Sequence, residues 1–274
     1  MSIVVLVAAH KSYKISKQTI YRPILVGAKD NSIQAPIDET TYWVQDNSYC
    51  NISEKNPYYC ELTALYWAWK NLKDDYIGLF HYRRYFRSRR VSLNKWERIM
   101  GEEELLSLLK ERNTLLPMPQ HYFIETNYSQ YVHAHNGREL DIVREILSER
   151  YPAYITAFDT CMKQTSGHRF NMLVMRRDIL CLYCEWLFDV LFDLENRLMM
   201  TGELRPRIIG HVAERLLDVW IIHNQISYFD VPVVFMERQH WIRKSLTFLL
   251  RKVRPGQEPR WMRDEVSDSS YSHV

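Results

Sequence analysis

The sequence predicts an α/β fold, built as a single Rossmann-type domain with a mixed central sheet flanked by helices. Short apolar runs with strand character alternate with amphipathic helical segments along the chain. With 274 residues, of which 46% are hydrophobic and 25% charged, the chain can bury one large core. The apolar run 76–80 leads directly into a histidine and two arginines, which places polar side chains where a central strand ends.

The first half of the chain supplies strands and one well-marked helix. Residues 3–9 form an apolar first strand that ends in His10-Lys11, and residues 23–27 form a second strand. Residues 28–52 are polar, irregular and too long for a simple connection, so we expect them to line a site. Asn56-Pro57 opens a helix with a capping residue and a proline at its first position, and the strand at 76–80 follows it.

The second half continues the alternation. We expect helices at 102–112, 140–150, 178–199 and 207–224, and strands at 114–117, 170–175 and 231–235. A strand-like stretch at 128–136 carries Tyr131, His133 and His135. Pro232 lies within the last strand and indicates a sheet edge, because proline has no N–H to donate to a neighbouring strand.

Composition excludes several classes of protein. A formal net charge of +3 is too small to indicate nucleic-acid binding. No apolar stretch is long enough to span a bilayer, and residues 1–7 lack the basic start of a signal peptide. The 5 cysteines are an odd number, and the pair Cys181 and Cys184 falls within a helical pattern without a second metal pair. We therefore expect free thiols and a cytoplasmic protein.

The end of the chain differs from the rest. Residues 1–237 form the expected domain, and residues 238–264 form a basic amphipathic extension, in which residues 238–263 carry eight lysines and arginines and the single acid Glu258. Such a helix either lies on the anionic inner membrane surface or packs on the domain with its basic face exposed. Residues 265–274 are expected to be disordered.

The segment 81–84, His-Tyr-Arg-Arg, predicts an anion site. Arginine side chains at the end of a central strand suit a phosphate group, whereas the alternative is a pair of surface arginines that close the strand. His10 and Lys11 follow the first strand and are predicted to contact a nucleotide. The chain has no glycine-rich phosphate loop and only 8 glycines.

Three long motifs identify a family resemblance. Residues 51–56 (NISEKN), 61–71 (ELTALYWAWKN) and 76–86 (YIGLFHYRRYF) resemble the bacterial family known as domain of unknown function 4422. The resemblance continues at 130–135, 170–172 and 210–216 and covers about residues 3–237. That family is associated with capsular and O-antigen polysaccharide synthesis and is similar to GT-A-type glycosyltransferases.

The resemblance implies transfer of a hexose from a nucleotide-diphosphate donor, with UDP expected, to a growing or lipid-linked bacterial surface polysaccharide. Some members are linked to galactofuranose transfer, but the sugar used by this chain does not follow. Two alternatives stay open: a non-catalytic nucleotide-sugar or glycan-binding module of an assembly complex, and a nucleotide-sugar hydrolase or phosphotransferase.

The chemistry can be assigned to candidate residues. The leaving diphosphate needs positive charge, and arginines stand where a metal-dependent enzyme would carry Asp-x-Asp, so we expect no required cofactor and no metal ligands, with Mn²⁺ or Mg²⁺ as the alternative. Glu214 is the first choice for a general base in an inverting transfer, with His211 one helical turn before it; the alternative is a structural ion pair.

The expected donor-binding residues are His10, Lys11, Asn51, Asn56, Lys70, His81, Tyr82, Arg83, Arg84 and Asn171. The expected acceptor or sugar contacts are Tyr131, His133 and His135. Glu61 and Lys70 share the motif helix and either reach the site or brace the loop at 51–56.

Overall fold

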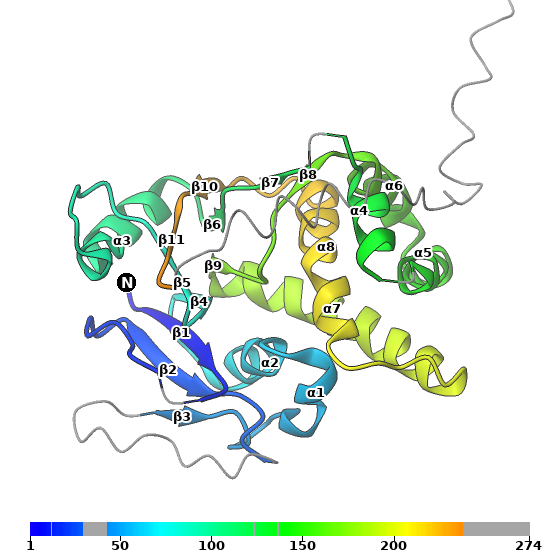
Figure 1. Ribbon diagram of the computed structural model, residues 1–274, viewed down its shortest axis with the longest axis horizontal. Helices are drawn as coiled ribbons and strands as arrows, with labels where there is room; N and C mark the ends of the chain where they lie inside the picture. Colours follow the sequence, from blue (N-terminus) through cyan, green and yellow to red (C-terminus); the bar gives the residue numbers. More distant parts are fainter. Residues whose placement is uncertain (12, 30–42, 123, 136, 238–274) are drawn as a thin grey trace, which may run out of the picture.

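The computed structural model describes residues 1–11, 13–29, 43–122, 124–135 and 137–237, and its centre is a mixed sheet (Figure 1). The strand order is β10-β6-β9-β4-β1-β2-β3. The strands of this path are β1 (Ile3–Ala9), β2 (Tyr21–Leu25), β3 (Val44–Gln45), β4 (Tyr76–His81), β6 (Thr114–Pro117), β9 (Leu173–Arg176) and β10 (Phe229–Val231). Strands β1 to β4 are parallel, and β9 runs antiparallel to both β4 and β6. The predicted mixed α/β fold is therefore confirmed.

Two further strand pairs extend the structure. Strand β5 (Arg84–Phe86) folds back on the end of β4 and pairs with β11 (Val233–Phe235), while β7 (Gln120–His121) and β8 (Ser166–Gly167) form a separate ribbon. Pro232 is exposed and separates β10 from β11, so the expected late strand is two short strands with different partners. The change of partner at the proline follows from its missing N–H.

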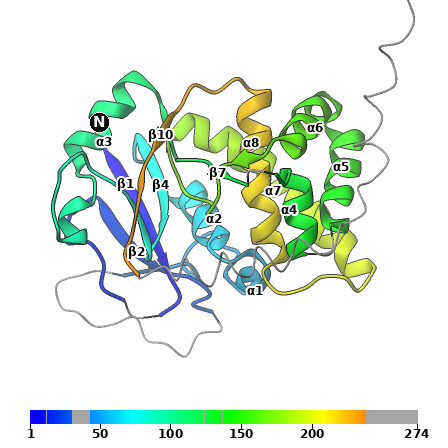
Figure 2. The same ribbon diagram turned by 45° about the horizontal axis from the view of Figure 1, so that its top comes forward.

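Helices cover both faces of the sheet. They are η1 (Ser53–Lys55), α1 (Asn56–Tyr59), α2 (Leu62–Asn71), η2 (Lys95–Arg98), α3 (Glu102–Glu111), α4 (Asn127–Ala134), α5 (Arg138–Arg150), η3 (Pro152–Tyr154), α6 (Ile155–Lys163), α7 (Arg177–Met200) and α8 (Ile208–His223). Helix α3 lies on one side of the sheet, and α4 to α8 gather on the other (Figures 1 and 2). Helix α8 packs on both α6 and α7.

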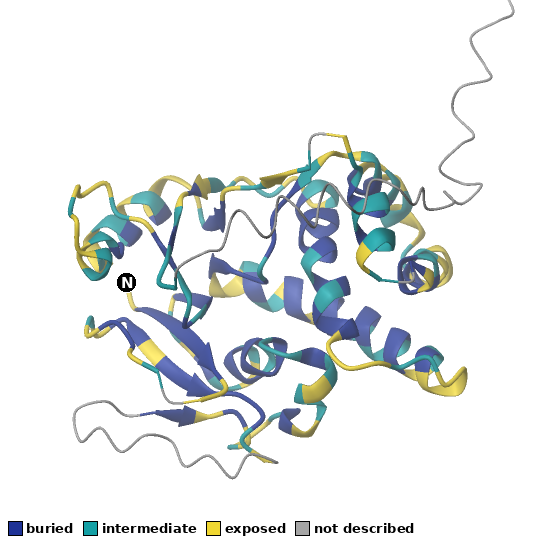
Figure 3. Ribbon diagram, viewed as in Figure 1, coloured by how far each residue is buried: buried dark blue, intermediate teal, exposed yellow. Residues whose placement is uncertain are grey.

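Strand β1 divides the core into two parts. All seven of its residues are buried. Figure 3 shows most of β1 and of its neighbour β2 in the dark blue of buried residues. Leu6 and Ala8 join the cluster formed with α2 and α5 to α8, whereas Val5 and Val7 join the cluster formed with α3. A parallel strand covered on both faces reads as a continuous apolar run, which is why β1 was recognisable from sequence.

Three expectations about local structure are wrong. The stretch that carries Tyr131 and His133 is helix α4, not a strand, and His135 is its C-cap residue; Thr126 caps the start by accepting a hydrogen bond from the backbone N–H of Ser129. Asn171 lies in a turn before β9 rather than on the strand. The helix expected from Asn56 is interrupted at Cys60, which adopts the left-handed φ of 53° and separates α1 from α2.

The predicted extension at 238–264 and the predicted tail at 265–274 lie outside the described residues. Within the described residues, no helix combines the length and the apolar character needed to cross a membrane. All 5 cysteines, including Cys181 and Cys184 of α7, are free thiols.

Candidate active site

A cavity of about 440 Å³ opens at the carboxyl ends of β1 and β4. This is the edge at which open α/β sheets bind ligands. Strand ends, the α1–α2 corner and the start of α8 all contribute to it. Its lining residues are Ala8, Ala9, His10, Val26, Asn56, Pro57, Cys60, Glu61, His81, Arg83 and Arg207. Four of the residues expected to bind the donor, namely His10, Asn56, His81 and Arg83, therefore face one cavity.

A buried hydrogen-bond network shapes the wall that carries Asn56. Asp46 is fully buried, and its carboxylate accepts hydrogen bonds from Gly27 N (2.8 Å), Ala28 N (3.0 Å), Ser53 Oγ (2.6 Å) and Thr63 Oγ1 (2.6 Å). These donors lie after β2, in η1 and in α2. One side chain thus joins the three segments that surround this side of the cavity.

His81 ends β4 as a neutral donor. Its Nδ1 accepts the backbone N–H of Arg83 at 3.3 Å, which leaves the proton on Nε2. Burial, followed by the nearby charges of Arg84 and Arg83, lowers the pKa of His81 to about 3. An uncharged imidazole that lines the cavity can donate a hydrogen bond to a phosphate oxygen at any physiological pH.

The two adjacent arginines separate in space. Arg83 lines the cavity, and its Nε forms an ion pair with Glu237 Oε2 at 3.0 Å. Arg84 instead lies over the ring of Phe170, with 3.9 Å from Cζ to the ring centroid. Burial lowers the pKa of Arg84, and the nearby carboxylates Glu61 and Glu214 oppose that effect. Arg83 is therefore the arginine of this pair that faces a ligand in the cavity.

Arg207 supplies a cation that the sequence reasoning missed. It precedes α8 with a left-handed φ of 66°, and its backbone N–H donates to Pro57 O at 2.8 Å, which fixes it beside α1. Burial lowers the pKa of both His10 and His81, and the charge of Arg207 adds to that effect. The sequence did contain an indication of this role. The helix dipole disfavours an arginine at a helix N-terminus, so an arginine at that position suggests a functional reason.

A strained turn leads from Arg169 into β9. Phe170 and Asn171 adopt left-handed φ values of 82° and 49°, which cost non-glycine residues free energy and cluster at functional sites. The buried Asn171 side chain donates from Nδ2 to Glu61 Oε1 (2.8 Å) and to the backbone oxygen of Gly210 (3.2 Å). Asn171 thus ties Glu61 to α8 and reaches the site from a turn rather than from a strand.

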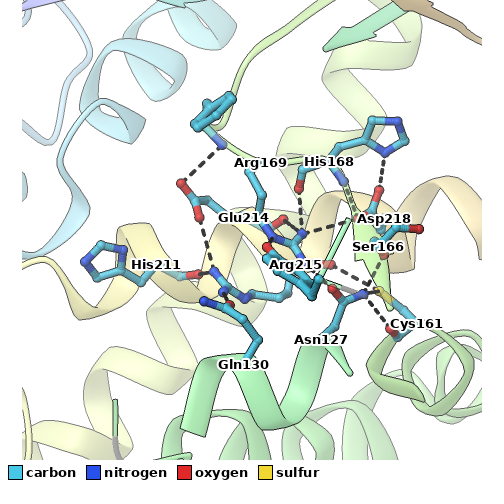
Figure 4. A network of polar contacts seen from close by, with 12 residues as sticks. Asn127, Gln130, Cys161, Ser166, His168, Arg169, His211, Glu214, Arg215 and Asp218 are labelled. Carbon is cyan, nitrogen blue, oxygen red and sulfur yellow. Dashed lines mark hydrogen bonds and ion pairs between the residues drawn. The ribbon is translucent and has the colours of Figure 1, made fainter. Parts of the chain in front are cut away.

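Glu214 supports this turn from α8, and the surrounding polar network appears in Figure 4. Its Oε1 accepts the backbone N–H of Phe170 at 3.1 Å, and its Oε2 accepts Arg215 Nη1 at 3.1 Å. Both oxygens therefore have a protein partner, and Glu214 is not among the residues that line the cavity.

Arg169 anchors the turn beneath Glu214 and was not predicted to have a role. Its guanidinium donates to His168 O (2.6 Å), Glu214 O (3.2 Å) and Tyr122 Oη (2.7 Å), and also to Asn127 Oδ1 (Figure 4). These bonds fix the backbone on which Phe170 and Asn171 stand. Arg169 lies directly before the predicted Phe-Asn motif, and that position was the available signal.

Beside it, His168 joins α8 to β10. Its Nδ1 hydrogen-bonds Asp218, and its Nε2 lies 2.9 Å from Asp230 Oδ1. Burial acts to lower the pKa of His168, but the hydrogen bonds to Asp218 and then Asp230 outweigh it and raise the pKa.

Comparison with known proteins identifies the family of this chain. A family model described as "Domain of unknown function (DUF4422)" matches residues 4–225. The chain belongs to this family. It is also similar to a solved structure titled "WbbM bifunctional glycosytransferase apo structure", at 31% identity and a TM-score of 0.75.

The match to WbbM covers 87% of this chain and 46% of that one, so the chain spans about half the length of that relative. This likeness confirms the GT-A-like fold that the sequence predicts for this chain. No curated protein matches the chain.

The residues expected to contact the acceptor divide into two groups. The rings of Tyr131, His135 and His211 form a row, with centroid separations of 4.7 and 4.6 Å. Burial lowers the pKa of His211. His133 instead pairs with Glu125, on a different side of α4. None of these residues lines the cavity.

Four other expected donor contacts also lie outside the cavity lining. Asn51 donates from Nδ2 to Asn47 O (3.1 Å) and Tyr49 O (2.8 Å), so it braces its own loop. Lys70 sits in the last turn of α2, with Nζ 3.3 Å from the ring centroid of Trp69. Tyr82 is buried, and Lys11 Nζ lies 6.0 Å from its ring centroid. Glu61, at the start of α2, therefore lines the cavity, whereas Lys70, at the opposite end of α2, does not.

Proposed function

We propose that the chain is a glycosyltransferase that moves a hexose from a UDP-linked donor to a growing or lipid-linked bacterial surface polysaccharide. The observation that carries this proposal is the cavity at the ends of β1 and β4, whose lining combines neutral His81 with the cations Arg83 and Arg207. Such groups bind a diphosphate and stabilise the negative charge that develops on it as it leaves. The likeness to WbbM, which is described as a bifunctional glycosyltransferase, supports the same activity.

The transfer is proposed to invert the anomeric carbon and to need no metal ion. A divalent ion that bridges a diphosphate requires several oxygen ligands from the protein or from water. Among the described residues, no three His, Cys, Asp or Glu side chains are grouped to hold a metal. Glu61 is the carboxylate in the cavity lining, and the cations Arg83 and Arg207 line the same cavity. One carboxylate among cations is a poor donor set for a divalent ion, which supports the proposal that fixed cations take its role.

We propose that the enzyme works at the cytoplasmic face of the inner membrane, where a lipid-linked acceptor would lie. Residues 238–264 carry eight basic side chains, and we propose that they hold the domain against anionic lipid. This part of the proposal rests on the sequence of that segment alone.

Calorimetric titration of the full chain with UDP tests the donor site. We expect UDP to bind with the same Kd in EDTA and in Mn²⁺. Arg207→Ala should weaken binding about 10-fold, which corresponds to about 1.4 kcal/mol for one charge-assisted phosphate contact. Arg22→Ala is the matched control, because Arg22 is an exposed arginine of β2 outside the cavity lining. Binding that appears only with Mn²⁺ would overturn the metal-independent site.

Transfer is measured with UDP-hexoses as donors and octyl galactoside as the probe acceptor. A glycosyltransferase gives an elongated octyl glycoside and UDP in equal amounts. Free hexose formed at the same rate with and without the probe acceptor would instead identify a hydrolase. UDP-hexose binding without turnover in the presence of membrane lipid extracts would identify a binding module.

A further inference from the structure

The carboxylate that can reach the acceptor differs from the one that the sequence indicates. Glu214 has both oxygens engaged, by Phe170 N and Arg215 Nη1, and lies outside the cavity lining. Glu61 lines the cavity, and its carboxylate accepts hydrogen bonds from Asn171 Nδ2, to Oε1 at 2.8 Å, and from its own backbone N–H. Both donors are uncharged, and the carboxylate lies at the cavity in which a ligand would bind.

The backbone holds Glu61 in this position. Cys60 takes a left-handed φ of 53° between α1 and α2, and Glu61 follows it as the N-cap of α2. Its carbonyl accepts the N–H of Ala64 at 3.1 Å, so the residue already belongs to the helical turn. Asn171, from the strained turn on the opposite side, fixes the carboxylate orientation. A rigid backbone and a neutral hydrogen-bond partner are what a positioned base requires.

We propose that Glu61 is the general base of the transfer and that Glu214 is a positioning residue. In this step the acceptor O–H proton moves to Glu61 Oε2, and the acceptor oxygen forms a bond to the anomeric carbon. The bond from that carbon to the diphosphate oxygen breaks, and UDP leaves with the electron pair. Arg83, Arg207 and the Nε2–H of His81 balance the charge that develops on it.

The electrostatic surroundings agree with this role. The charged groups that face Glu61 are Arg84 of β5 and Glu214 of α8, with the Cys60 thiol beside it. Burial raises the pKa of Glu61, which moves a carboxylate toward the range in which it accepts a proton efficiently near neutral pH. The hydrogen bonds from Asn171 and from the backbone N–H of Glu61 oppose this upward shift, Glu214 adds to it, and Arg84 opposes it.

Glu214 acts through the turn. Its bond to Phe170 N holds the left-handed pair Phe170 and Asn171, and Asn171 in turn holds Glu61. Removing Glu214 therefore loosens the base without deleting it.

The inference rests on the proposed glycosyltransferase function, and the test separates the two. Glu61→Gln should lower kcat by about 10² to 10⁴-fold while the Kd for UDP changes less than about 3-fold. Glu185→Gln, an exposed glutamate of α7, is the matched control and should keep wild-type activity. Wild-type protein that transfers no hexose would refute the function itself. Active wild-type protein with an equally active Glu61→Gln variant would refute only the inference.

The pH profile distinguishes a base from a structural residue. The logarithm of wild-type kcat should rise with pH at unit slope below the pKa of Glu61 and level off above it, because the base must be deprotonated. Glu61→Gln should lack this limb, and Glu214→Gln should keep it at a reduced kcat. Formate added to Glu61→Ala should restore part of the activity. If Glu61→Gln fails to fold, Glu61→Asp serves instead and should be slow but retain the limb. If the rise of kcat with pH disappears in Glu214→Gln but persists in Glu61→Gln, Glu214 rather than Glu61 is the base, and the proposal is overturned.

Discussion

Replacement of Asp46 offers a direct test of how the cavity wall is built. Asp46 is fully buried and accepts four hydrogen bonds, two from the backbone of Gly27 and Ala28 and two from the hydroxyls of Ser53 and Thr63. Each such bond contributes about 1 kcal/mol net, and donors left without a partner add to the loss. Asp46→Ala should therefore destabilise the domain by about 4 kcal/mol, a large part of the roughly 5–15 kcal/mol typical of a folded protein.

Asp46→Asn gives a finer measure, because it keeps the shape and removes half of the accepting capacity. Its amide nitrogen would then face two groups that donate to Asp46 Oδ1 in the wild type. The hydroxyl of Ser53 can rotate and accept a hydrogen bond from the amide, but the backbone N–H of Ala28 cannot. We expect a loss of about 2 kcal/mol.

Urea unfolding followed by circular dichroism measures both variants, and the midpoint for Asp46→Asn should fall by about 1 M. Asp74→Asn, at a partly exposed aspartate before β4, is the control and should stay within about 0.5 kcal/mol of wild type. A loss below about 0.5 kcal/mol for Asp46→Asn would refute the claim that these bonds stabilise the wall.

Two further predictions concern histidine protonation. His168 has its pKa raised above the unfolded value of 6.5, so its stabilising contribution is complete below pH 6.5 and is lost as pH rises through the folded pKa. Urea unfolding at several pH values should show that loss in wild type and not in His168→Gln; equal slopes would contradict it. His81 has its pKa lowered from 6.5 to about 3, so it opposes folding increasingly as pH falls from 6.5 toward 3. Its ring should give neutral-imidazole nitrogen shifts by NMR at pH 5, and a charged ring there would show that the burial argument is wrong.

Much of the fold could be predicted because it is encoded locally. Strand β1 and helix α7 are long apolar patterns, and their observed bounds, Ile3–Ala9 and Arg177–Met200, lie within about two residues of those expected. Local patterns failed where they were short. The alternation of Tyr131, His133 and His135 resembles a strand, but the cap at Thr126 and packing of α4 against α6 make it a helix.

The candidate site was predictable to the same extent. His10 follows β1 and His81 is the last residue of β4, and the two strands are parallel neighbours, so the meeting of these histidines at one edge follows from topology. The break at Cys60, which aims Glu61, leaves no such mark, because a left-handed φ on a non-glycine residue depends on surrounding packing rather than on its own preference.

The alternating α/β order, the strand that leads to His81 and Arg83, and the family motifs that contain these residues could all be recognised in the sequence. The tertiary structure alone decided that Arg207 closes the cavity and that Glu61, rather than Glu214, faces it. The physical reason is that periodicity and capping are properties of neighbouring residues. The direction of a buried carboxylate is set instead by partners far along the chain, here Asn171 for Glu61, and Phe170 and Arg215 for Glu214.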